Sequence, residues 1–298
     1  MQYQFEHYAM ATQFSLVIAE ETEDYARNAS IQVFELIDRL EHQLSRFIPD
    51  SDISRINRMK ADEQLHLDFE TWEILKMAIK ITQDTHGAFD VGVARHMDIF
   101  RATKEGILNE FEMTNALSVV QREKHESSIY IDPETPIAYC GKAGIQFDLG
   151  GIGKGYALDK VKDFLLELGV ENFTVSAGDS TLLVNNNNDL KTHWDYTIAN
   201  ASEKMSLELS NIVVSASGTF FQGNHIFDPR TGSNALSGTH KRLWVASETA
   251  AFSDAFATAL FIVSIEEMHE IVKKSDKITW VAYTEDEHLK LVTKNNLS

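Results

Sequence analysis

Apolar segments with two different periods follow one another along this chain in an irregular order. Some are short runs of the kind that form β-strands, and others carry apolar side chains three and four residues apart, as amphipathic helices do. The steady strand–helix alternation of a doubly wound parallel sheet is missing, so we predict an α+β fold with a β-sheet core and flanking helices. The expected helices are Asp24–Phe47, Asp68–His86, Lys154–Leu168 and a fourth from about Ser253 past Val263; the expected strands are Phe14–Ile18, Ser128–Asp132, Gly144–Leu149, Phe173–Ser176, Thr181–Val184, Trp194–Ala199, Asn211–Ser215, Arg242–Ser247, Ile278–Thr284 and Leu289–Thr293.

Residues that start and stop helices support these assignments. Asp68 is a suitable N-cap for the second helix, and Gly87 follows its end. Gly169 stands directly after the third helix, where a residue with positive φ is common. Neither an internal repeat nor a linker rich in Pro, Gly or Ser divides the sequence. We therefore expect a single domain over residues 1–298.

The charge balance restricts the class of partner. The chain has 27 Lys and Arg residues against 45 Asp and Glu residues, a formal net charge of −18. A surface this acidic repels phosphate backbones, which argues against nucleic acid as the main partner. A small anionic ligand would need backbone amides, a basic side chain or a metal ion to bind.

Cysteine content and hydropathy exclude further classes. Cys140 is the only cysteine, so an intrachain disulfide framework and a Cys-rich metal site are both excluded. No apolar stretch approaches the ~20 residues of a membrane span. The first residues have neither the basic start nor the apolar run of a signal peptide. The sequence as given predicts a cytoplasmic protein, or an exported one if a signal was removed.

A glycine-rich segment at Phe147–Tyr156 is expected to link a strand to the third helix. It contains four glycines and Lys154 within the six residues 150–155. Glycines let backbone amides approach a ligand closely, and a helix N-terminus favours anions. The spacing matches neither a Walker A loop nor a dinucleotide fingerprint. Anion binding is our preferred interpretation, and the alternative is that the glycines serve only close packing.

Asp254 and Thr258 lie one turn apart on the fourth expected helix, so their side chains share a face. A carboxylate and a hydroxyl are hard oxygen ligands, which suit Mg²⁺. The competing interpretation is that Asp254 stabilises the helix N-terminus while Thr258 packs in the core.

Polar turns supply further candidates. His225–Gly232 contains an Asp-Pro turn, and its histidine could act as an acid or base near neutral pH. Gly87–Asp90 and Ala177–Asp179 are acidic turns after a helix and a strand. Each of these motifs is weak when taken alone.

Taken together and in order, these motifs resemble the ApbE family of FAD:protein FMN transferases. The resemblance covers nearly the whole chain. The segments that carry it are Met10–Phe14, Ser45–Phe47, Asp50–Ser51, Ile56–Asn57, Gly87–Asp90, Asp148–Tyr156, Ala177–Asp179, Ser217–Gly218, His225–Gly232 and Ser253–Leu260. The chain differs from the usual family pattern at Ala177, where a glycine is common, and it shows no N-terminal lipid-bearing cysteine.

The resemblance implies a single α+β domain with FAD in a cleft and a Mg²⁺-dependent transfer of FMN to a threonine hydroxyl of a target flavoprotein, with release of AMP. It implies Gly151, through its carbonyl, Asp254 and Thr258 as metal ligands. The FAD contacts that it implies are Met10, Phe47, Ala88, Phe89, Asp90, Asp148, Lys154 and Phe227.

The implied reaction needs two kinds of help from the protein. Cleavage of a pyrophosphate requires neutralised charge on both phosphoryl groups, which Mg²⁺, the amides of residues 150–155 and Lys154 would share. The acceptor threonine must lose a proton, and Asp179 and His225 are both candidates for the base. Two other functions stay open: a Mg²⁺-dependent FAD pyrophosphatase that uses water as acceptor, and a flavin-binding protein without turnover.

Overall fold

A computed structural model describes residues 1–186, 194–218, 227–232 and 242–296. The chain divides into two compact units. The sheet unit comprises Met1–Glu41, Ile152–Phe221 and Gly238–Ser298, and the helix-rich unit comprises His42–Gly151 and Gln222–Ser237. The expectation of one domain over residues 1–298 stays a prediction, and we describe each unit by itself.

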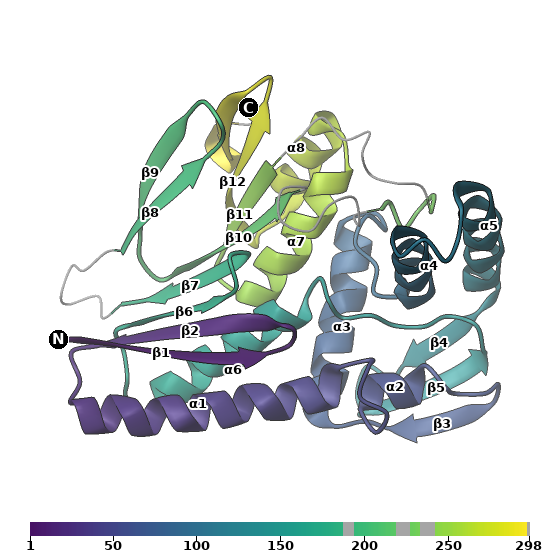
Figure 1. Cartoon of the computed structure of the whole chain (residues 1–298), viewed down its shortest axis with the longest axis horizontal. Helices are drawn as coiled ribbons and strands as arrows, with labels where there is room; N and C mark the ends of the chain where they lie inside the picture. Colours follow the sequence, from purple (N-terminus) through teal and green to yellow (C-terminus); the bar gives the residue numbers. More distant parts are fainter. Residues whose placement is uncertain (187–193, 219–226, 233–241, 297–298) are drawn as a thin grey trace. The chain divides into compact units, whose positions relative to one another are not determined.

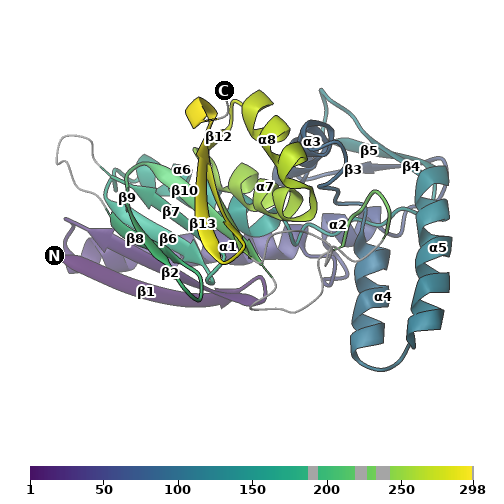
Figure 2. The ribbon, with the colours of Figure 1, turned by 90° about the horizontal axis from the view of Figure 1, so that it is seen from above.

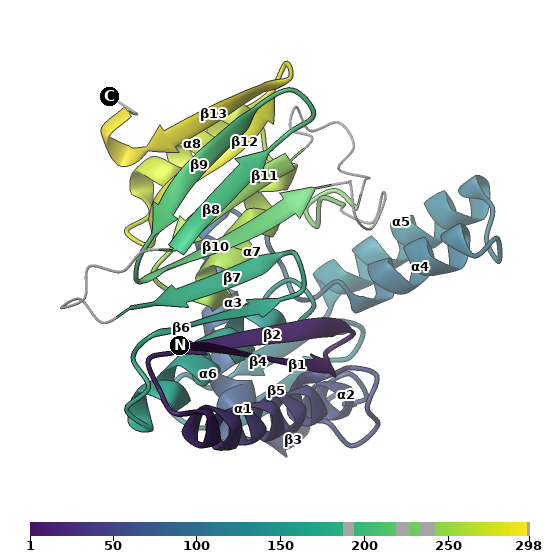
Figure 3. The ribbon, with the colours of Figure 1, turned by 60° about the vertical axis from the view of Figure 1, so that its left-hand side comes forward.

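An eight-stranded sheet forms the core of the sheet unit, and each pair of neighbouring strands is antiparallel. The strand order is β1-β2-β6-β7-β10-β11-β12-β13, which Figure 3 shows from one edge to the other. An antiparallel sheet with separate helices is an α+β arrangement, so the predicted fold class is confirmed. The strands are β1 Gln2–Ala9, β2 Thr12–Ala19, β6 Phe173–Ala177, β7 Thr181–Asn185, β10 Ile212–Gly218, β11 Arg242–Ser247, β12 Ile278–Glu285 and β13 His288–Thr293.

Strand β11 is covered on both faces of the sheet, which explains the apolar run Leu243–Ala246 within it. Trp244 and Ala246 pack in a cluster with residues of the two-stranded sheet formed by β8 (Trp194–Ala199) and β9 (Lys204–Leu209). Leu243 and Val245 alternate with them and are equally buried. Helix α7 (Ala250–Ile262) packs against β10 and β11 on the face opposite β8 and β9 (Figure 2). A strand buried on both faces loses the apolar–polar alternation of a half-exposed strand.

Helix α7 lies at the centre of the sheet unit and is buried over most of its length. Its sequence contains alanines at 250, 251, 255, 257 and 259, which allow its backbone to approach neighbouring elements closely. It packs against α6 (Gly153–Glu167) as well as the sheet. The remaining helices of this unit are α8 (Ile265–Lys274), the short η3 (Lys294–Asn296) and most of α1 (Glu23–Leu44), whose last residues belong to the helix-rich unit.

Among its described residues, the helix-rich unit holds a small antiparallel sheet in the order β3-β5-β4 and four helices (Figure 1). Helices α4 and α5 lie side by side as an antiparallel pair. The second of them begins with a capping box, in which Asn109 and Glu112 exchange side-chain-to-backbone bonds. The elements are β3 Glu63–His66, β4 Ser128–Ile131, β5 Ile137–Lys142, α2 Asp52–Ile56, α3 Phe69–Asp84, α4 Ala94–Lys104 and α5 Glu110–Glu126.

The predicted strand at Gly144–Leu149 is wrong, because this segment is paired with no strand. The side-chain amide of Asn57 takes the place of a partner: it accepts from Phe147 N at 2.6 Å and donates to Phe147 O at 2.9 Å. Asp148 N donates to Val91 O, at 2.8 Å. The burial of Phe147 and Leu149 explains the alternation in the sequence, but the pairing comes from loops. The strand of this region is β5, which the sequence analysis did not predict.

The four predicted helices are confirmed as α1, α3, α6 and α7, with ends displaced by a few residues. The fourth does not run past Val263, because Ser264 caps the separate helix α8. Asp68 is the N-cap residue of α3 as predicted, although its side chain makes no capping bond. Gly169 follows α6 with φ of 76°, as expected for a C′ glycine. Strands β7 and β8 follow one another in the sequence but lie in different sheets.

Within the described part of the chain, no helix combines the length and the apolar character that crossing a bilayer requires.

Candidate functional site

The residues that the sequence analysis selected are distributed over both units. Met10, Lys154, Asp179, Asp254 and Thr258 belong to the sheet unit. The helix-rich unit holds the others, and His225 lies outside the described residues. The members of this second group are Phe47, Ala88, Phe89, Asp90, Asp148, Gly151 and Phe227.

Asp254 is a buried acid on α7 with a cation beside it. Its side chain is 8% exposed, and its Oδ2 lies 3.6 Å from Lys154 Nζ. Gly155 N also donates to this oxygen, at 3.3 Å. Burial of a carboxylate costs free energy unless charge and hydrogen bonds compensate it, and the start of α6 supplies both. The structure thus brings Lys154 and Asp254 together, although 99 residues separate Gly155 from Asp254 in the sequence.

Thr258 lies one turn after Asp254 on the same helix and is partly buried. Its Oγ1 donates to Asp254 O at 3.3 Å, which leaves the lone pairs of the hydroxyl available to a cation. The described residues contain no group of three or more His, Cys, Asp or Glu side chains placed to hold a metal ion. A donor set of one carboxylate, one hydroxyl and a backbone carbonyl fits Mg²⁺, which keeps several waters, better than it fits zinc.

Helix α6 contacts the first turn of α7 through two residues that are themselves one turn apart. A Cβ at Gly155 would lie 2.2 Å from Ala250 O, so only glycine permits this approach. Asp159 accepts hydrogen bonds from Ala250 N at 2.7 Å and Ala251 N at 2.8 Å. Burial raises the pKa of Asp159 from 3.8 to about 6, against the opposite effect of the two N–H bonds. The short distance between a Cβ at position 155 and Ala250 O shows that the glycine at this position serves close packing of α6 against α7.

The sequence analysis missed Asp159. One signal was present: the acid follows Gly155 by four residues and so shares its helix face. A glycine and a carboxylate on one face of a helix indicate a closely approaching backbone with N–H groups to satisfy.

Met10 and Asp179 lie in neighbouring turns of the sheet unit. Met10 and Ala11 have φ of 49° and 57° and form the two-residue turn between β1 and β2. The turn after β6 lies against it, since Gly178 N donates to Gln13 O at 2.7 Å. Met10 is partly buried and Asp179 is exposed, so the carboxylate of Asp179 is accessible to solvent.

In the helix-rich unit, Asp148 is held by an arginine. Arg46 Nε lies 2.6 Å from Asp148 Oδ2, and the two terminal nitrogens of Arg46 bind Asp98 at 3.1 Å and 2.7 Å. Gly150 N donates to the other oxygen of Asp148, at 2.8 Å. Burial lowers the pKa of Arg46, but the bonds and charges of the two aspartates outweigh burial and raise it above its ordinary value. Phe47 is exposed, and its ring faces the guanidinium groups of Arg46 and Arg101.

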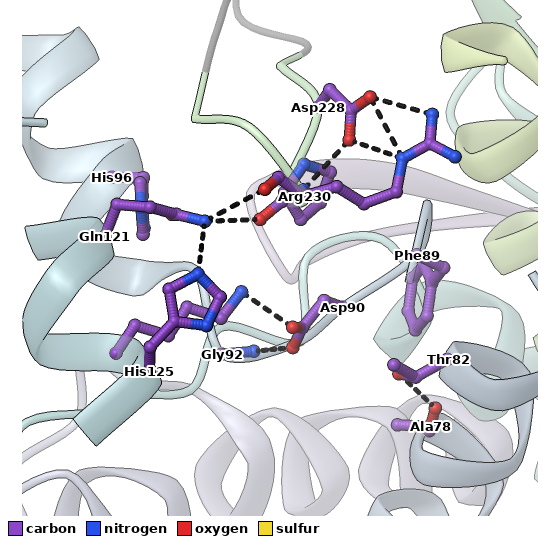
Figure 4. Close-up of polar contacts among 12 residues, drawn as sticks. Ala78, Thr82, Phe89, Asp90, Gly92, His96, Gln121, His125, Asp228 and Arg230 are labelled. Carbon is purple, nitrogen blue, oxygen red and sulfur yellow. Dashed lines mark hydrogen bonds and ion pairs between the residues drawn. The ribbon is translucent and has the colours of Figure 1, made fainter. Parts of the chain in front are cut away.

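Ala88, Phe89 and Asp90 form the turn after α3. The first two side chains are buried, so contact with a ligand would have to come from their backbone. Asp90 accepts from Gly92 N at 2.7 Å and from Lys124 Nζ at 2.7 Å. Figure 4 shows both oxygens of Asp90 occupied within the unit.

Phe227 is also packed inside the helix-rich unit. Its ring is 5% exposed and stacks on His96, with centroids 5.2 Å apart. Gln121 accepts from His96 Nε2 at 2.9 Å and donates to Pro229 O and Arg230 O, both at 3.2 Å (Figure 4). Burial lowers the pKa of His96 below its ordinary value, which favours the neutral ring. Gln121 and His96, which no sequence motif indicated, thus hold the turn that follows Phe227.

Comparison with known proteins agrees with the motifs. A model of the ApbE family matches residues 10–282. An FAD:protein FMN transferase from Buchnera aphidicola is 25% identical over 278 residues, which are 87% of this chain and 77% of that protein. A second, from Vibrio cholerae, is 24% identical and covers 81% of this chain and 75% of its own length.

Solved structures show the same fold. The flavin transferase ApbE from Vibrio cholerae superimposes with a TM-score of 0.83 at 20% identity, over 100% of this chain and 98% of the other. The ApbE protein from Thermotoga maritima gives a TM-score of 0.80 at 21% identity, over 98% and 97%. With a family model matching most of its length, the chain belongs to the ApbE family and is an enzyme of the transferase class.

Proposed function

We propose that the protein is a Mg²⁺-dependent FAD:protein FMN transferase, which moves the FMN part of FAD to a threonine hydroxyl of a target flavoprotein and releases AMP. The observation that carries this proposal is the buried carboxylate of Asp254, one turn before Thr258 and 3.6 Å from Lys154. An acid, a hydroxyl and a lysine at a helix N-terminus suit a cation and a pyrophosphate together. The names of the relatives supply the reaction class.

Asp254, Thr258 and the carbonyl of Gly151 are the proposed ligands of Mg²⁺. When bound, the ion would act as a Lewis acid on the two phosphoryl groups of the FAD pyrophosphate. Lys154 is the proposed partner of a phosphoryl oxygen, since its ammonium group lies 3.6 Å from Asp254 and so approaches the same position. The glycine-rich amides before α6 would add donors toward the same anion.

We assign contacts with the flavin and adenine rings of FAD to residues whose side chains reach the surface. Phe47 presents an exposed ring suited to stacking on a planar heterocycle, and Met10 lies on an outward turn. Asp148 and Asp90 are already bonded to Arg46 and Lys124, so we assign them the shaping of their loops as their first role. Within the helix-rich unit, the buried side chains of Ala88, Phe89 and Phe227 would support the loops that carry these contacts.

The proton of the acceptor hydroxyl needs a base. A base must be accessible to the acceptor hydroxyl, and Asp179 meets this requirement because its carboxylate is exposed in the turn after β6. His225 lies outside the described residues and stays the second candidate. Replacing each in turn and measuring the pH profile of transfer would separate them, since loss of the base removes the acidic limb of the profile.

The test of the proposed function is mass spectrometry of a candidate flavoprotein after incubation with the protein, FAD and Mg²⁺. We expect the target to gain the mass of FMN less water, with one AMP released for each target modified. A target whose acceptor threonine is replaced by valine is the control and gains no mass. Fast AMP and FMN release without any acceptor would replace the transferase by a pyrophosphatase. Saturable FAD binding without AMP release under every condition would leave only a flavin-binding protein.

A further inference from the structure

Helix α7 begins without the usual help from its own N-cap residue. Thr249 occupies the N-cap position with extended backbone, but its side chain makes no capping bond. Its Oγ1 is buried and has no hydrogen-bond partner among the described residues. A helix start buried in this way leaves N–H groups that must be satisfied from elsewhere.

Asp159 of α6 satisfies them. Its two carboxylate oxygens accept separately from Ala250 N at 2.7 Å and Ala251 N at 2.8 Å. A negative charge at a helix N-terminus also interacts favourably with the helix dipole. The cap of α7 therefore comes from a different helix, and the bond joins α6 to α7.

The same two helices make a second contact, one turn earlier on α6 and one turn later on α7. Gly155 precedes Asp159 by one turn of α6, and Asp254 follows Ala250 by one turn of α7. Gly155 N donates to Asp254 Oδ2 at 3.3 Å, and the absence of a Cβ at Gly155 allows Ala250 O to come close. A shift of α7 along or about its axis would break both contacts at once.

We propose that Asp159 is a positioning residue for Asp254. Its carboxylate holds the first turn of α7 against α6, so that the Asp254 carboxylate stays beside Lys154 Nζ and Gly155 N. This inference rests on the proposed function, in which Asp254 holds Mg²⁺. The physical reason is geometric: Mg²⁺ requires nearly ideal octahedral geometry, and residues that orient its ligands affect metal affinity strongly.

The test compares metal binding in the wild type and in Asp159→Asn at pH 8, with FAD present. Asparagine keeps one acceptor oxygen but loses the charge and one of the two N–H bonds. Mn²⁺, which electron paramagnetic resonance detects directly, is the probe. We expect about 10-fold weaker Mn²⁺ binding, the lower end of the effect of an orienting residue. We also expect faster hydrogen exchange of the Gly155 amide and unchanged FAD affinity.

Two further variants separate positioning from simple helix capping. In Ser264→Ala, α8 loses its own cap, the bond from Glu267 N to Ser264 Oγ at 3.2 Å. We expect this control to lower the melting temperature without changing Mn²⁺ binding or Gly155 exchange. In Asp159→Ala combined with Thr249→Asp, α7 regains a local cap but not the link to α6. We expect its Mn²⁺ affinity to stay weak, whether or not the melting temperature recovers.

Several outcomes would overturn the inference. One is an Asp159→Asn variant that resembles Ser264→Ala, with a lower melting temperature but wild-type Mn²⁺ binding and Gly155 exchange. Another is full recovery of Mn²⁺ affinity in the double variant. The variant Asp254→Asn shows whether the positioning role of Asp159 or the proposed metal site itself has failed. If it loses Mn²⁺ while Asp159→Asn keeps it, only the positioning role fails; if it binds Mn²⁺ normally, the proposed metal site fails and the positioning role with it.

Discussion

Asp148 and Asp90 of the helix-rich unit are held differently from Asp254 of the sheet unit. In the helix-rich unit, Asp148 and Asp90 each bind a basic side chain at 2.6–2.7 Å and a backbone N–H at 2.7–2.8 Å. In the sheet unit, Asp254 is more deeply buried than either, yet its contacts with Lys154 and Gly155 are longer, at 3.6 Å and 3.3 Å. Short paired contacts identify acids that maintain a loop. The longer contacts of Asp254 support the proposal that this acid holds a further cation.

This difference also separates two effects of mutation. Removing a partner of Asp148 leaves a charge without compensation and should reduce stability. Removing the charge of Asp254 should reduce activity more than stability, because burial of that carboxylate is itself costly. Replacements of Asp254 and Arg46 test this distinction directly, and those of Gly155 and Asp159 test the contact between α6 and α7.

Asp254→Asn should reduce the rate of Mg²⁺-dependent AMP release by ~10²-fold or more, because it removes the charge that holds the cation. Saturable FAD binding and the melting temperature should change little, and raising the Mg²⁺ concentration should restore part of the rate. AMP release measured against Mg²⁺ concentration, beside a thermal melt, is the test. A destabilised variant with wild-type turnover and wild-type Mg²⁺ dependence would refute the metal role.

Gly155→Ala should destabilise the sheet unit by up to about 3 kcal/mol, since the added Cβ would overlap Ala250 O and force α6 and α7 apart. Denaturant unfolding gives this value. Gly169→Ala is the matched control: no atom lies within 4 Å of its added Cβ, and only its positive φ opposes the change. The control should cost about 1 kcal/mol. If both variants lose the same free energy of unfolding, the contact between α6 and α7 can accommodate a Cβ at position 155.

Arg46→Lys should cost about 1–2 kcal/mol, because an ammonium group cannot bind Asp98 with two nitrogens and Asp148 with a third. Arg27→Lys is the control, since Arg27 and Glu23 form an exposed pair with both side chains 60% exposed. It should change the free energy of unfolding by no more than about 0.5 kcal/mol. If both replacements are neutral in denaturant unfolding, the Asp148 loop does not depend on Arg46.

The pH dependence of stability should reveal Asp159. Its pKa is about 6 in the folded chain against 3.8 as the ordinary value, so between these pH values the folded state binds more protons than the unfolded state. The contribution of Asp159 to the free energy of unfolding is therefore fully present below about pH 4 and is lost as the pH rises to about 6. Because the residue is only partly buried, we expect a change of about 1 kcal/mol.

The measurement is the difference in free energy of unfolding between the wild type and Asp159→Asn from pH 4 to pH 7. All other titrating groups are common to both proteins, so the difference isolates Asp159. A difference that does not vary with pH would show that the pKa of Asp159 is near its ordinary value.

Local signals in the sequence predicted four of the described helices and most of the strands. Periodicity located α1, α3, α6 and α7, and apolar runs located the strands of the large sheet other than β1, because these patterns report which face of an element is buried. The same signal failed at Gly144–Leu149, where burial alternates as in a strand but Asn57 satisfies the backbone. Short elements such as α2 and β3 were missed because they have too few residues to show a period. The longer helices α4 and α5 were missed too, because few of their side chains are buried and no apolar stripe marks them. Helix α8 and strand β1 were also not predicted.

The order of apolar segments along the chain predicted the fold class, and the one-turn spacing of Asp254 and Thr258 predicted that their side chains share a helix face. The motifs, taken in order, indicated the family through their resemblance to ApbE proteins. The tertiary structure alone decided which acids already have partners. Arg46 reaches Asp148 across 102 residues, and Asp159 caps a helix that begins 91 residues later. Spacing in a sequence predicts which side chains lie close together only within one element. Contacts between elements arise when apolar faces pack together and bring distant polar groups into the same buried region, where each must find a partner.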